Sequence, residues 1–348
     1  MEEKKKKVLL IRLSALGDVI FNIPLANALK DAGYEVIWLV SEKGVQVVEN
    51  NPCVDKTIMV PLYGWRKKGF SFNKIKEFFT IIKQLRAEKF DIAIDCQMMF
   101  KSLFFMLFCG AKRRIISKNA KELSVLGGNE FVKDIFCDYD SSIVLNYLKY
   151  ALYLGIKPEK LKVSLPARSK KQIEKIDNLL AGLDKTKPLV IIAPATTWKN
   201  KHWSKENWKI VVDNISERCN IVFTGGEGDK ELIEYINCGR FLNLAGKTDI
   251  MGLMELFSRA QLVISPDSGS AHLAWATGNP AVVTIFTCTP KTLFAPIGNP
   301  DKYVSLGGKG LPCQPCFKKY CKLKKNPDAC TCFPNPCDVI DVVKSLIF

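Results

Sequence analysis

The feature that most constrains the fold is a regular alternation of short apolar runs with longer amphipathic segments. Apolar runs lie at residues 8–12, 35–40 and 90–95, and each is followed by a polar turn and a segment of helical periodicity. Strands covered by helices on both faces are near-continuous apolar runs, and strands alternating with helices build parallel, doubly wound sheets. The sequence therefore predicts an α/β fold.

The alternation stops once and then starts again, which predicts two domains. Residues 158–187 are richer in Lys, Pro and Gly, and a new apolar run begins at Leu189. A chain of 348 residues is long enough for two cores. We expect a Rossmann-like domain at residues 1–166, a connection with one helix at 167–187, a second Rossmann-like domain at 188–337 and a terminal helix at 338–348. Such domains face a central cleft. Further helices are expected at 18–30, 41–50 and 98–109.

The composition narrows the range of partners without choosing one. Lys and Arg number 51 against 35 Asp and Glu, a net charge of +16. That charge favours phosphorylated substrates, nucleic acid or an anionic membrane surface, but no basic and aromatic residues interleave as they do in nucleic-acid-binding motifs. No apolar run approaches the ~20 residues of a membrane-spanning helix, and the run at 8–11 is too short for a secretory signal. We expect a cytoplasmic protein, at most peripheral to a membrane.

Cysteines are concentrated near the C-terminus. The chain has 13, and in a cytoplasmic protein they are expected to be reduced thiols or metal ligands. The cluster runs Cys313, Cys316, Cys321, Cys330, Cys332, Cys337. Its spacing matches no standard zinc pattern, and neighbouring prolines indicate a loop. We expect no metal; if a structural zinc or an iron–sulfur group were bound, its candidate ligands would be Cys313, Cys316, Cys321 and Cys330.

One strand-to-turn-to-helix stretch is typical of an anion site. The apolar run 261–264 leads into Asp267, Ser268 and Gly269, and a helix is expected at 271–276. A helix N-terminus directs free N–H groups and a positive dipole end at its ligand, which favours phosphate. The Asp267 carboxylate suits hydroxyls beside that phosphate. The alternative is a capped helix in an ordinary α/β fold.

Three more predicted strands end in polar residues. After the first, Asp18 could deprotonate a hydroxyl, or it could simply cap a helix. The segment 194–203 carries two threonines and two lysines, which suit a diphosphate. Glu227, in a glycine-rich turn, suits a ribose diol.

The only two histidines lie inside these segments, at 202 and 272, and His272 is expected to orient its neighbours. Asp138 and Asp140 are explained by a helix start rather than a metal.

Taken together, these segments resemble the lipopolysaccharide heptosyltransferases, glycosyltransferase family 9, which have the GT-B fold. The resemblance covers nearly the whole chain in order, and it rests on residues 12–20, 95–97, 101–102, 196–197, 201–203, 225–227, 243–248, 267–269, 272 and 312–317. Two features depart from the family pattern. Met98 stands where many members have Gly, and the cysteine tail is longer than usual.

The resemblance implies an inverting transfer of heptose from ADP-heptose to the inner core of lipopolysaccharide, on Kdo-lipid A or heptosyl-Kdo-lipid A, without a metal cofactor. It implies that Asp18 is the general base. The implied donor-binding residues are Thr196, Thr197, Lys201, Glu227, Lys247, Thr248, Asp267, Ser268, Gly269 and His272. The expected acceptor-binding residues are Ser14, Gly17, Arg66, Lys67, Gln97, Lys101 and Arg113.

Other interpretations stay open from the sequence. A family member could use another nucleotide-sugar or another glycan acceptor. From a different class, the charge would suit a nucleic-acid-binding protein and the cysteines a metal-binding one. The apolar segment 98–109, followed by basic residues 112–114, could rest on an anionic inner membrane, although a buried helix is the favoured interpretation.

Overall fold

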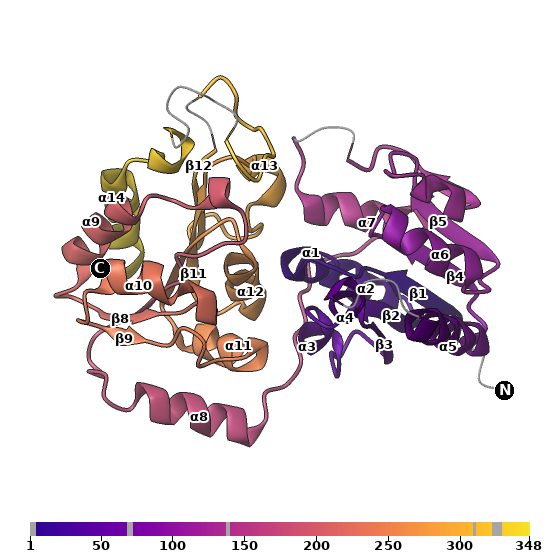
Figure 1. Cartoon of the computed structure of the whole chain (residues 1–348), viewed down its shortest axis with the longest axis horizontal. Coiled ribbons are helices and arrows are strands. Elements are labelled where there is room, and N and C mark those ends of the chain that lie inside the picture. The colour runs from indigo at the N-terminus through magenta and orange to yellow at the C-terminus, as the bar shows by residue number, and fades with distance from the viewer. Residues whose placement is uncertain (1–4, 68–71, 137–139, 309–310, 322–328) are drawn as a thin grey trace. The chain divides into compact units, whose positions relative to one another are not determined.

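The structure is a computed structural model of the whole chain, and it describes residues 5–67, 72–136, 140–308, 311–321 and 329–348. The chain divides into two compact units, Met1–Ala167 and Arg168–Phe348. Each unit contains a parallel sheet with helices packed on it (Figure 1). The two units are described separately below.

The first unit is built on a six-stranded sheet in the order β3-β2-β1-β4-β5-β6. Its strands are β1 Lys7–Ile11, β2 Glu35–Ser41, β3 Lys56–Val60, β4 Ile92–Asp95, β5 Arg113–Ser117 and β6 Glu130–Val132. Its helices are α1 Leu16–Phe21, α2 Ile23–Asp31, α3 Val45–Val48, α4 Leu62–Lys67, α5 Phe72–Glu88, α6 Phe100–Phe108, α7 Ile143–Tyr153 and the short 3-10 helix η1 Ser124–Gly127.

The second unit repeats this plan with the order β12-β11-β10-β7-β8-β9. Its strands are β7 Leu189–Ile192, β8 Asn220–Phe223, β9 Leu242–Asn243, β10 Leu262–Pro266, β11 Ala281–Phe286 and β12 Tyr303–Gly307. Its α-helices are α8 Lys170–Leu180, α9 Lys205–Ile215, α10 Lys230–Asn237, α11 Ile250–Arg259, α12 Gly269–Thr277, α13 Lys291–Phe294 and α14 Pro336–Ile347. Its 3-10 helices are η2 Lys199–Lys201, η3 Glu227–Asp229 and η4 Ala329–Cys332.

Both sheets have the strand order of the Rossmann fold, counted from the first strand of each unit. Every strand pair is parallel. The order reverses between β1 and β4 in one unit and between β7 and β10 in the other. Ligands of such sheets bind beyond the carboxyl ends of the strands at this reversal. The predicted pair of doubly wound α/β domains is confirmed.

The strands are apolar because helices cover both faces of each sheet. Residues Val8 to Ile11 of β1 are fully buried, and all five residues of β10 are buried. In the second unit Trp203 packs edge to face on Trp208 of α9, at 5.1 Å between ring centroids, in a core cluster that includes residues of α14. Burying side chains on both faces of a strand removes any alternation from its sequence, which explains the continuous apolar runs.

Two helices differ from their expected extent. The helix expected at 18–30 is divided at Asn22, which ends α1 and begins α2. Pro24 lies in the first turn of α2, where its missing N–H costs nothing. The helix expected at 41–50 shrinks to Val45–Val48, because Ser41 still belongs to β2 and residues 42–44 form a turn.

Two strands were not expected. The strand β6 has only three residues, and β12 is half-buried throughout, so neither has a strong apolar pattern.

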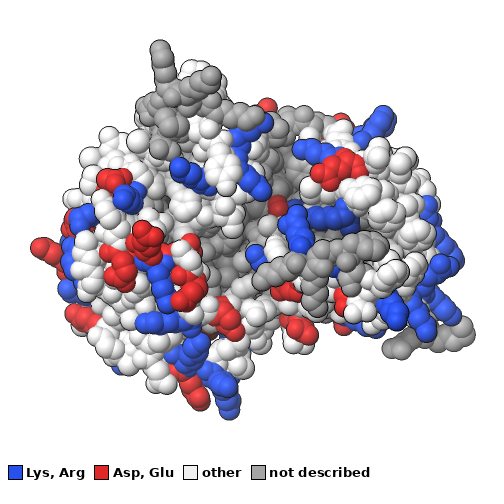
Figure 2. All heavy atoms as spheres, viewed as in Figure 1, with Lys and Arg blue, Asp and Glu red and all other residues white. Residues whose placement is uncertain are grey.

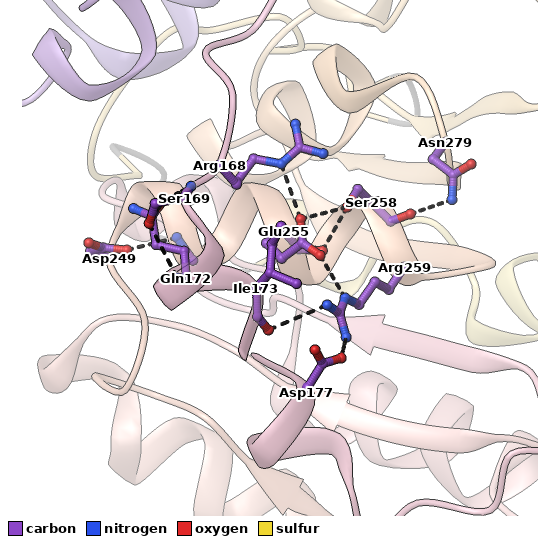
Figure 3. Close-up of polar contacts among 11 residues, drawn as sticks. Arg168, Ser169, Gln172, Ile173, Asp177, Asp249, Glu255, Ser258, Arg259 and Asn279 are labelled. Carbon is purple, nitrogen blue, oxygen red and sulfur yellow. Dashed lines mark hydrogen bonds and ion pairs between the residues drawn. The ribbon is translucent and has the colours of Figure 1, made fainter. Parts of the chain in front are cut away.

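Residues 167–187 contain α8, which packs on α11 of the second unit through a network of charged groups. Glu255, nearly buried on α11, accepts hydrogen bonds from Arg168 at 3.1 Å and from Arg259 at 2.7 Å. Arg259 also pairs with Asp177 of α8. Figure 3 shows these side chains converging between the two helices. The network therefore holds α8 against α11, the helix that follows Asp249.

Candidate functional site

In the first unit, the polar residues at the strand-order reversal gather around Asp18. This residue lies in the first turn of α1, just beyond the end of β1. Its Oδ2 accepts a charged hydrogen bond from Arg12 at 2.6 Å and a second from the Ala15 N–H at 3.1 Å. The Asp18 side chain remains 30% exposed. The carboxylate is thus held in one orientation while part of it stays open to solvent.

Arg12 is the residue that fixes Asp18, and it is itself buried. Its other terminal nitrogen donates to the carbonyl oxygen of Cys96 at 2.5 Å and to the hydroxyl of Tyr147 at 2.9 Å. Burial opposes the positive charge, but the neighbouring Asp18 outweighs it, so the pKa of Arg12 lies above its ordinary value. Arg12 is therefore permanently charged beside Asp18. Tyr147 comes from α7, a contribution that its sequence position does not signal.

The turn between β1 and α1 is shaped by side chains from the end of β4. Gln97 Oε1 accepts the N–H groups of Leu13 and Ser14, both at 3.0 Å. Lys101 donates to the Ser14 hydroxyl at 2.6 Å. Burial, and then the charge of Arg12, lowers the pKa of Lys101 to about 8. Three of the predicted acceptor residues, Ser14, Gln97 and Lys101, thus lie together near Asp18.

Asp95 holds the residues that follow β4 in place. It ends β4 and is fully buried, accepting the N–H groups of Gln97 and Met98 and the hydroxyl of Ser102 at 2.7–3.0 Å. Burial raises the pKa of Asp95 to about 6. Met98 adopts a positive φ of 53° in this turn, a conformation that glycine adopts more readily.

The other predicted acceptor residues lie in different environments. Gly17 is buried in α1. Arg66 is exposed on α4, and its charge contributes to lowering the pKa of Lys101. Lys67 ends α4, and its side chain lies outside the described residues. Arg113 begins β5 and pairs with Glu130 at 2.7 Å. Because β5 is parallel to β4, Arg113 lies at the amino ends of the strands, whereas Asp18 lies beyond their carboxyl ends.

In the second unit, the corresponding point is organised around Asp267, which follows β10. Its Oδ2 accepts hydrogen bonds from Lys201 and from the Thr289 hydroxyl, both at 2.6 Å, and its Oδ1 contacts His272 Nε2 at 3.1 Å. The side chain is only 2% exposed. Burial opposes ionisation, but Lys201 and His272 outweigh it, and they hold the pKa of Asp267 well below its ordinary value.

The segment after β7 and the start of α12 complete this group. Ser268 caps α12 and Gly269 is the first residue of that helix. Thr196 donates to the backbone oxygen of Asp267 at 3.5 Å, and His202 Nε2 contacts the Thr196 carbonyl at 2.8 Å. Thr197 is exposed. The structure therefore places Thr196, Lys201, Asp267 and His272 together.

A cavity of about 260 Å³ opens beside this group. It is lined by Ala193, Ala195, Thr224, Gly225, Gly226, Asp229, Thr248, Asp249, Ile250, Leu253 and Ser270. These residues come from the ends of β7 and β8, from the start of α11 and the two residues before it, and from the first turn of α12. Pockets for drug-sized ligands are about 300 Å³ or larger, so this one suits part of a ligand, such as a nucleobase.

The glycine-rich turn carries Glu227 toward the segment before α11. The side chain is 74% exposed and pairs with Lys230 at 2.5 Å. A Cβ on Gly246 would lie 2.1 Å from Glu227 Oε2, and Gly246 has a φ of +73°. The Glu227 carboxylate thus lies against a backbone turn whose conformation favours glycine. Lys247 is exposed, whereas Thr248 lines the cavity.

Two threonines after β11 were not identified from the sequence. Thr289 donates to Asp267, and Thr287 donates to the backbone oxygen of Asn200, next to Lys201, at 2.5 Å. Both are almost fully buried. The sequence carried one weak signal for these threonines. They are polar residues that directly follow a buried strand, at the carboxyl end of a parallel sheet.

The cysteine-rich segment contacts the Lys201 region through its backbone. The N–H of Asn200 donates to the Lys319 carbonyl at 3.2 Å, and the N–H of Cys316 donates to the Cys288 carbonyl at 3.0 Å. Among the described residues, which exclude 322–328, no group of three or more His, Cys, Asp or Glu side chains is placed to hold a metal ion. In the same described part of the chain, the candidate ligands Cys313, Cys316, Cys321 and Cys330 are not joined in disulfide bonds.

Comparisons with known proteins find similar sequences in one enzyme family. The family model of glycosyltransferase family 9 (heptosyltransferase) matches residues 78–326. The lipopolysaccharide core heptosyltransferase OpsX of Haemophilus influenzae is 26% identical over 315 residues, covering 87% of this chain and 85% of its own.

Solved structures share the fold. A glycosyl transferase of family 9 from Veillonella parvula superposes with a TM-score of 0.83 at 20% identity, covering 100% of this chain and 98% of its own. The Escherichia coli heptosyltransferase WaaC with ADP-2-deoxy-2-fluoro heptose gives a TM-score of 0.68 at 22% identity, covering 87% of this chain and 94% of its own.

Among the residues that the structure describes, no helix has the length and apolar character to cross a membrane.

Proposed function

Since the chain belongs to glycosyltransferase family 9, we propose that this glycosyltransferase moves a heptose from ADP-heptose to the inner core of lipopolysaccharide, with inversion at the sugar. The family match and the heptosyltransferase relatives support the donor and the acceptor class. The observation that carries the chemistry is the half-open carboxylate of Asp18, fixed by a buried arginine at the reversal point of a Rossmann-like sheet.

Asp18 is the general base of this proposal. It takes the proton of the acceptor hydroxyl as the hydroxyl oxygen bonds to the anomeric carbon, while the bond from that carbon to the ADP oxygen breaks and ADP leaves with the electron pair. Arg12 supports this role by holding Oδ2, which leaves Oδ1 for the hydroxyl. Lys101 and Arg66 are cations near this point, and they suit the phosphates or carboxylates of an inner-core acceptor.

The second unit holds the donor in this proposal. Thr196, Thr197 and Lys201 bind the diphosphate with the N–H groups of Ser268 and Gly269, Glu227 binds the ribose, and Lys247 and Thr248 lie near the adenine. The capped start of α12 and the cavity beside Thr248 support these roles.

Asp267 binds sugar hydroxyls, and His272 orients it. Asp267 is enclosed by Lys201, Thr289 and His272. Donor binding therefore requires Lys201 to turn from Asp267 toward the diphosphate.

We further propose that transfer needs no metal, because Lys201 and the N-terminus of α12 supply positive charge to the departing ADP. The enzyme acts on the cytoplasmic face of the inner membrane as a peripheral protein, and its partners are the nucleotide-sugar and the lipopolysaccharide acceptor rather than nucleic acid. Excess chelator should leave the transfer rate unchanged, and a rate restored only by added divalent metal would contradict this part.

The direct test is product mass analysis with ADP-heptose and two acceptors, Kdo-lipid A and heptosyl-Kdo-lipid A. One of the acceptors should gain one heptose. In a competition assay, ADP should inhibit more strongly than UDP or GDP. Stronger inhibition by UDP or GDP, or no heptose on either acceptor, would favour a family 9 enzyme with another nucleotide-sugar or another glycan acceptor.

A further inference from the structure

The helix α6 presents a row of aromatic side chains to solvent. Phe100, Phe104 and Phe108 are 49%, 41% and 45% exposed, and Leu107 on the same side is 37% exposed. The rings touch in series, with centroids 5.4 Å apart for Phe100 and Phe104 and 6.4 Å apart for Phe104 and Phe108. A contiguous row of this kind, unlike single exposed apolar residues, marks an interaction surface.

The neighbouring 3-10 helix enlarges this surface. Leu123 and Leu126 are 67% and 65% exposed, and they stand just before and within η1. The helix η1 packs directly on α6, since a Cβ on Gly127 would lie 3.1 Å from Met106 and 3.3 Å from Leu103. We name Phe100, Phe104, Leu107, Phe108, Leu123 and Leu126 the α6 apolar face.

The charges around the α6 apolar face are mostly positive. Residues 98–133 contain seven Lys and Arg against two Glu. Lys112, Lys118 and Lys121 are exposed. Both acidic residues are already engaged: Glu122 accepts the N–H of Phe100 at 3.1 Å, and Glu130 pairs with Arg113. In Figure 2 the first unit has a broad area without charged residues, bordered by many Lys and Arg and by one group of acidic residues.

The same helix also reaches the candidate site. Lys101, in the first turn of α6, donates to Ser14, beside Asp18. Because a helix with its side chains is only about 10 Å across, a surface that α6 contacts would lie close to the proposed base.

We propose that the α6 apolar face docks on an anionic lipid bilayer, with the aromatic rings inserted among the acyl chains and the surrounding lysines on the headgroups. The proposal rests on the proposed function in one respect, namely that the acceptor is anchored in that bilayer. Aromatic and leucine side chains with a basic rim suit the interface of an anionic membrane. A second copy of the chain fits less well, because a symmetric contact would set the two basic rims against each other.

Vesicle binding tests the proposal. Wild-type protein should co-sediment with vesicles of equal parts phosphatidylethanolamine and phosphatidylglycerol, and less with pure phosphatidylcholine. The triple variant Phe100→Gln, Phe104→Gln, Phe108→Gln should lose about tenfold or more of its partitioning. The matched control is Leu145→Gln with Leu152→Gln, two side chains on α7 that are 50% and 53% exposed. Equal partitioning of both variants would overturn the proposal.

Two further measurements separate the other outcomes. The triple variant should transfer sugar at the wild-type rate to a water-soluble, deacylated acceptor but more slowly to an acceptor embedded in vesicles. If the wild-type protein binds vesicles but transfers heptose to neither acceptor, the proposed function fails while the docking proposal stands. If sedimentation shows that wild type is a dimer and the variant a monomer, and neither binds vesicles, the face belongs to a second copy. The single variant Phe104→Gln serves if the triple variant fails to fold.

Discussion

The two units each place an aspartate at the reversal of strand order, yet the surroundings of the two carboxylates differ. Asp18 is 30% exposed and is held on one oxygen by Arg12. Asp267 is 2% exposed and is enclosed by Lys201, His272 and Thr289. A base needs an open oxygen that can receive a proton, whereas an enclosed carboxylate with a lowered pKa keeps its charge and fixes its neighbours. Two aspartates at the strand-order reversals of the same fold thus suit different chemical roles.

Lys101 of the first unit and Lys201 of the second also differ in the groups to which they are bonded. Lys201 forms an ion pair with Asp267, while Lys101 donates to the neutral hydroxyl of Ser14. Burial without a bonded counter-ion lowers the pKa of Lys101 to about 8. The charge of Lys101 therefore changes as the pH passes through about 8.

The largest effect is expected from removing the proposed base. Asp18→Asn keeps the shape of the side chain and removes its basicity, so the transfer rate should fall by about 10²–10⁴-fold, while ADP affinity measured by calorimetry stays unchanged. Asp267→Asn is the matched comparison, and it should act chiefly on donor binding. Near-normal turnover of Asp18→Asn would show that Asp18 is not the general base, and the proposed difference in role between Asp18 and Asp267 would then fail.

Breaking the enclosed ion pair should destabilise the second unit. Lys201→Met leaves the buried Asp267 charge without its main partner, which costs about 3–5 kcal/mol, measurable by denaturant unfolding. Lys230→Met breaks the exposed pair with Glu227 and should cost about 0–1 kcal/mol. ADP affinity should also fall in Lys201→Met. Equal destabilisation by both variants would show that burial does not distinguish the two pairs.

The hydroxyl of Thr289 should matter more than that of Thr287. Thr289→Val removes a hydrogen bond to a charged carboxylate, worth about 1.5–3 kcal/mol, whereas Thr287→Val removes one to a neutral carbonyl, worth about 0.5–1.5 kcal/mol. The unfolding free energies of the two variants measure this difference. A larger loss in Thr287→Val would mean that Thr289 does not contribute to holding Asp267.

The smallest effect is a pH dependence in the first unit. As the pH rises through about 8, Lys101 loses its proton and its attraction for an anionic acceptor. The acceptor KM should therefore rise about tenfold at one pH unit above the pKa if only the protonated form binds. Lys101→Arg stays charged and should lack this rise. A profile that is the same in both proteins would assign the pH dependence to another group.

The sequence predicted the fold class because the signal is local. Apolar strands covered on both faces and helices of regular period are visible in short windows, and their alternation leads to a doubly wound sheet. The ends of these strands then indicated Asp18, Lys201 and Asp267 as neighbours of a ligand. Short or half-exposed elements such as β6 and β12 were missed, since they bury too little to have a pattern.

The sequence alone thus determined the two α/β units and which strand ends carry polar groups. Only the tertiary structure decided how exposed each group is and what it touches. Arg12 contacts Tyr147, 135 residues away, and Thr289 contacts Asp267 from the segment that follows β11. The structure also placed Arg113 at the far edge of its sheet and turned the aromatic row of α6 outward. Periodicity is a property of neighbouring residues, whereas burial and pKa depend on chain segments that only folding brings together.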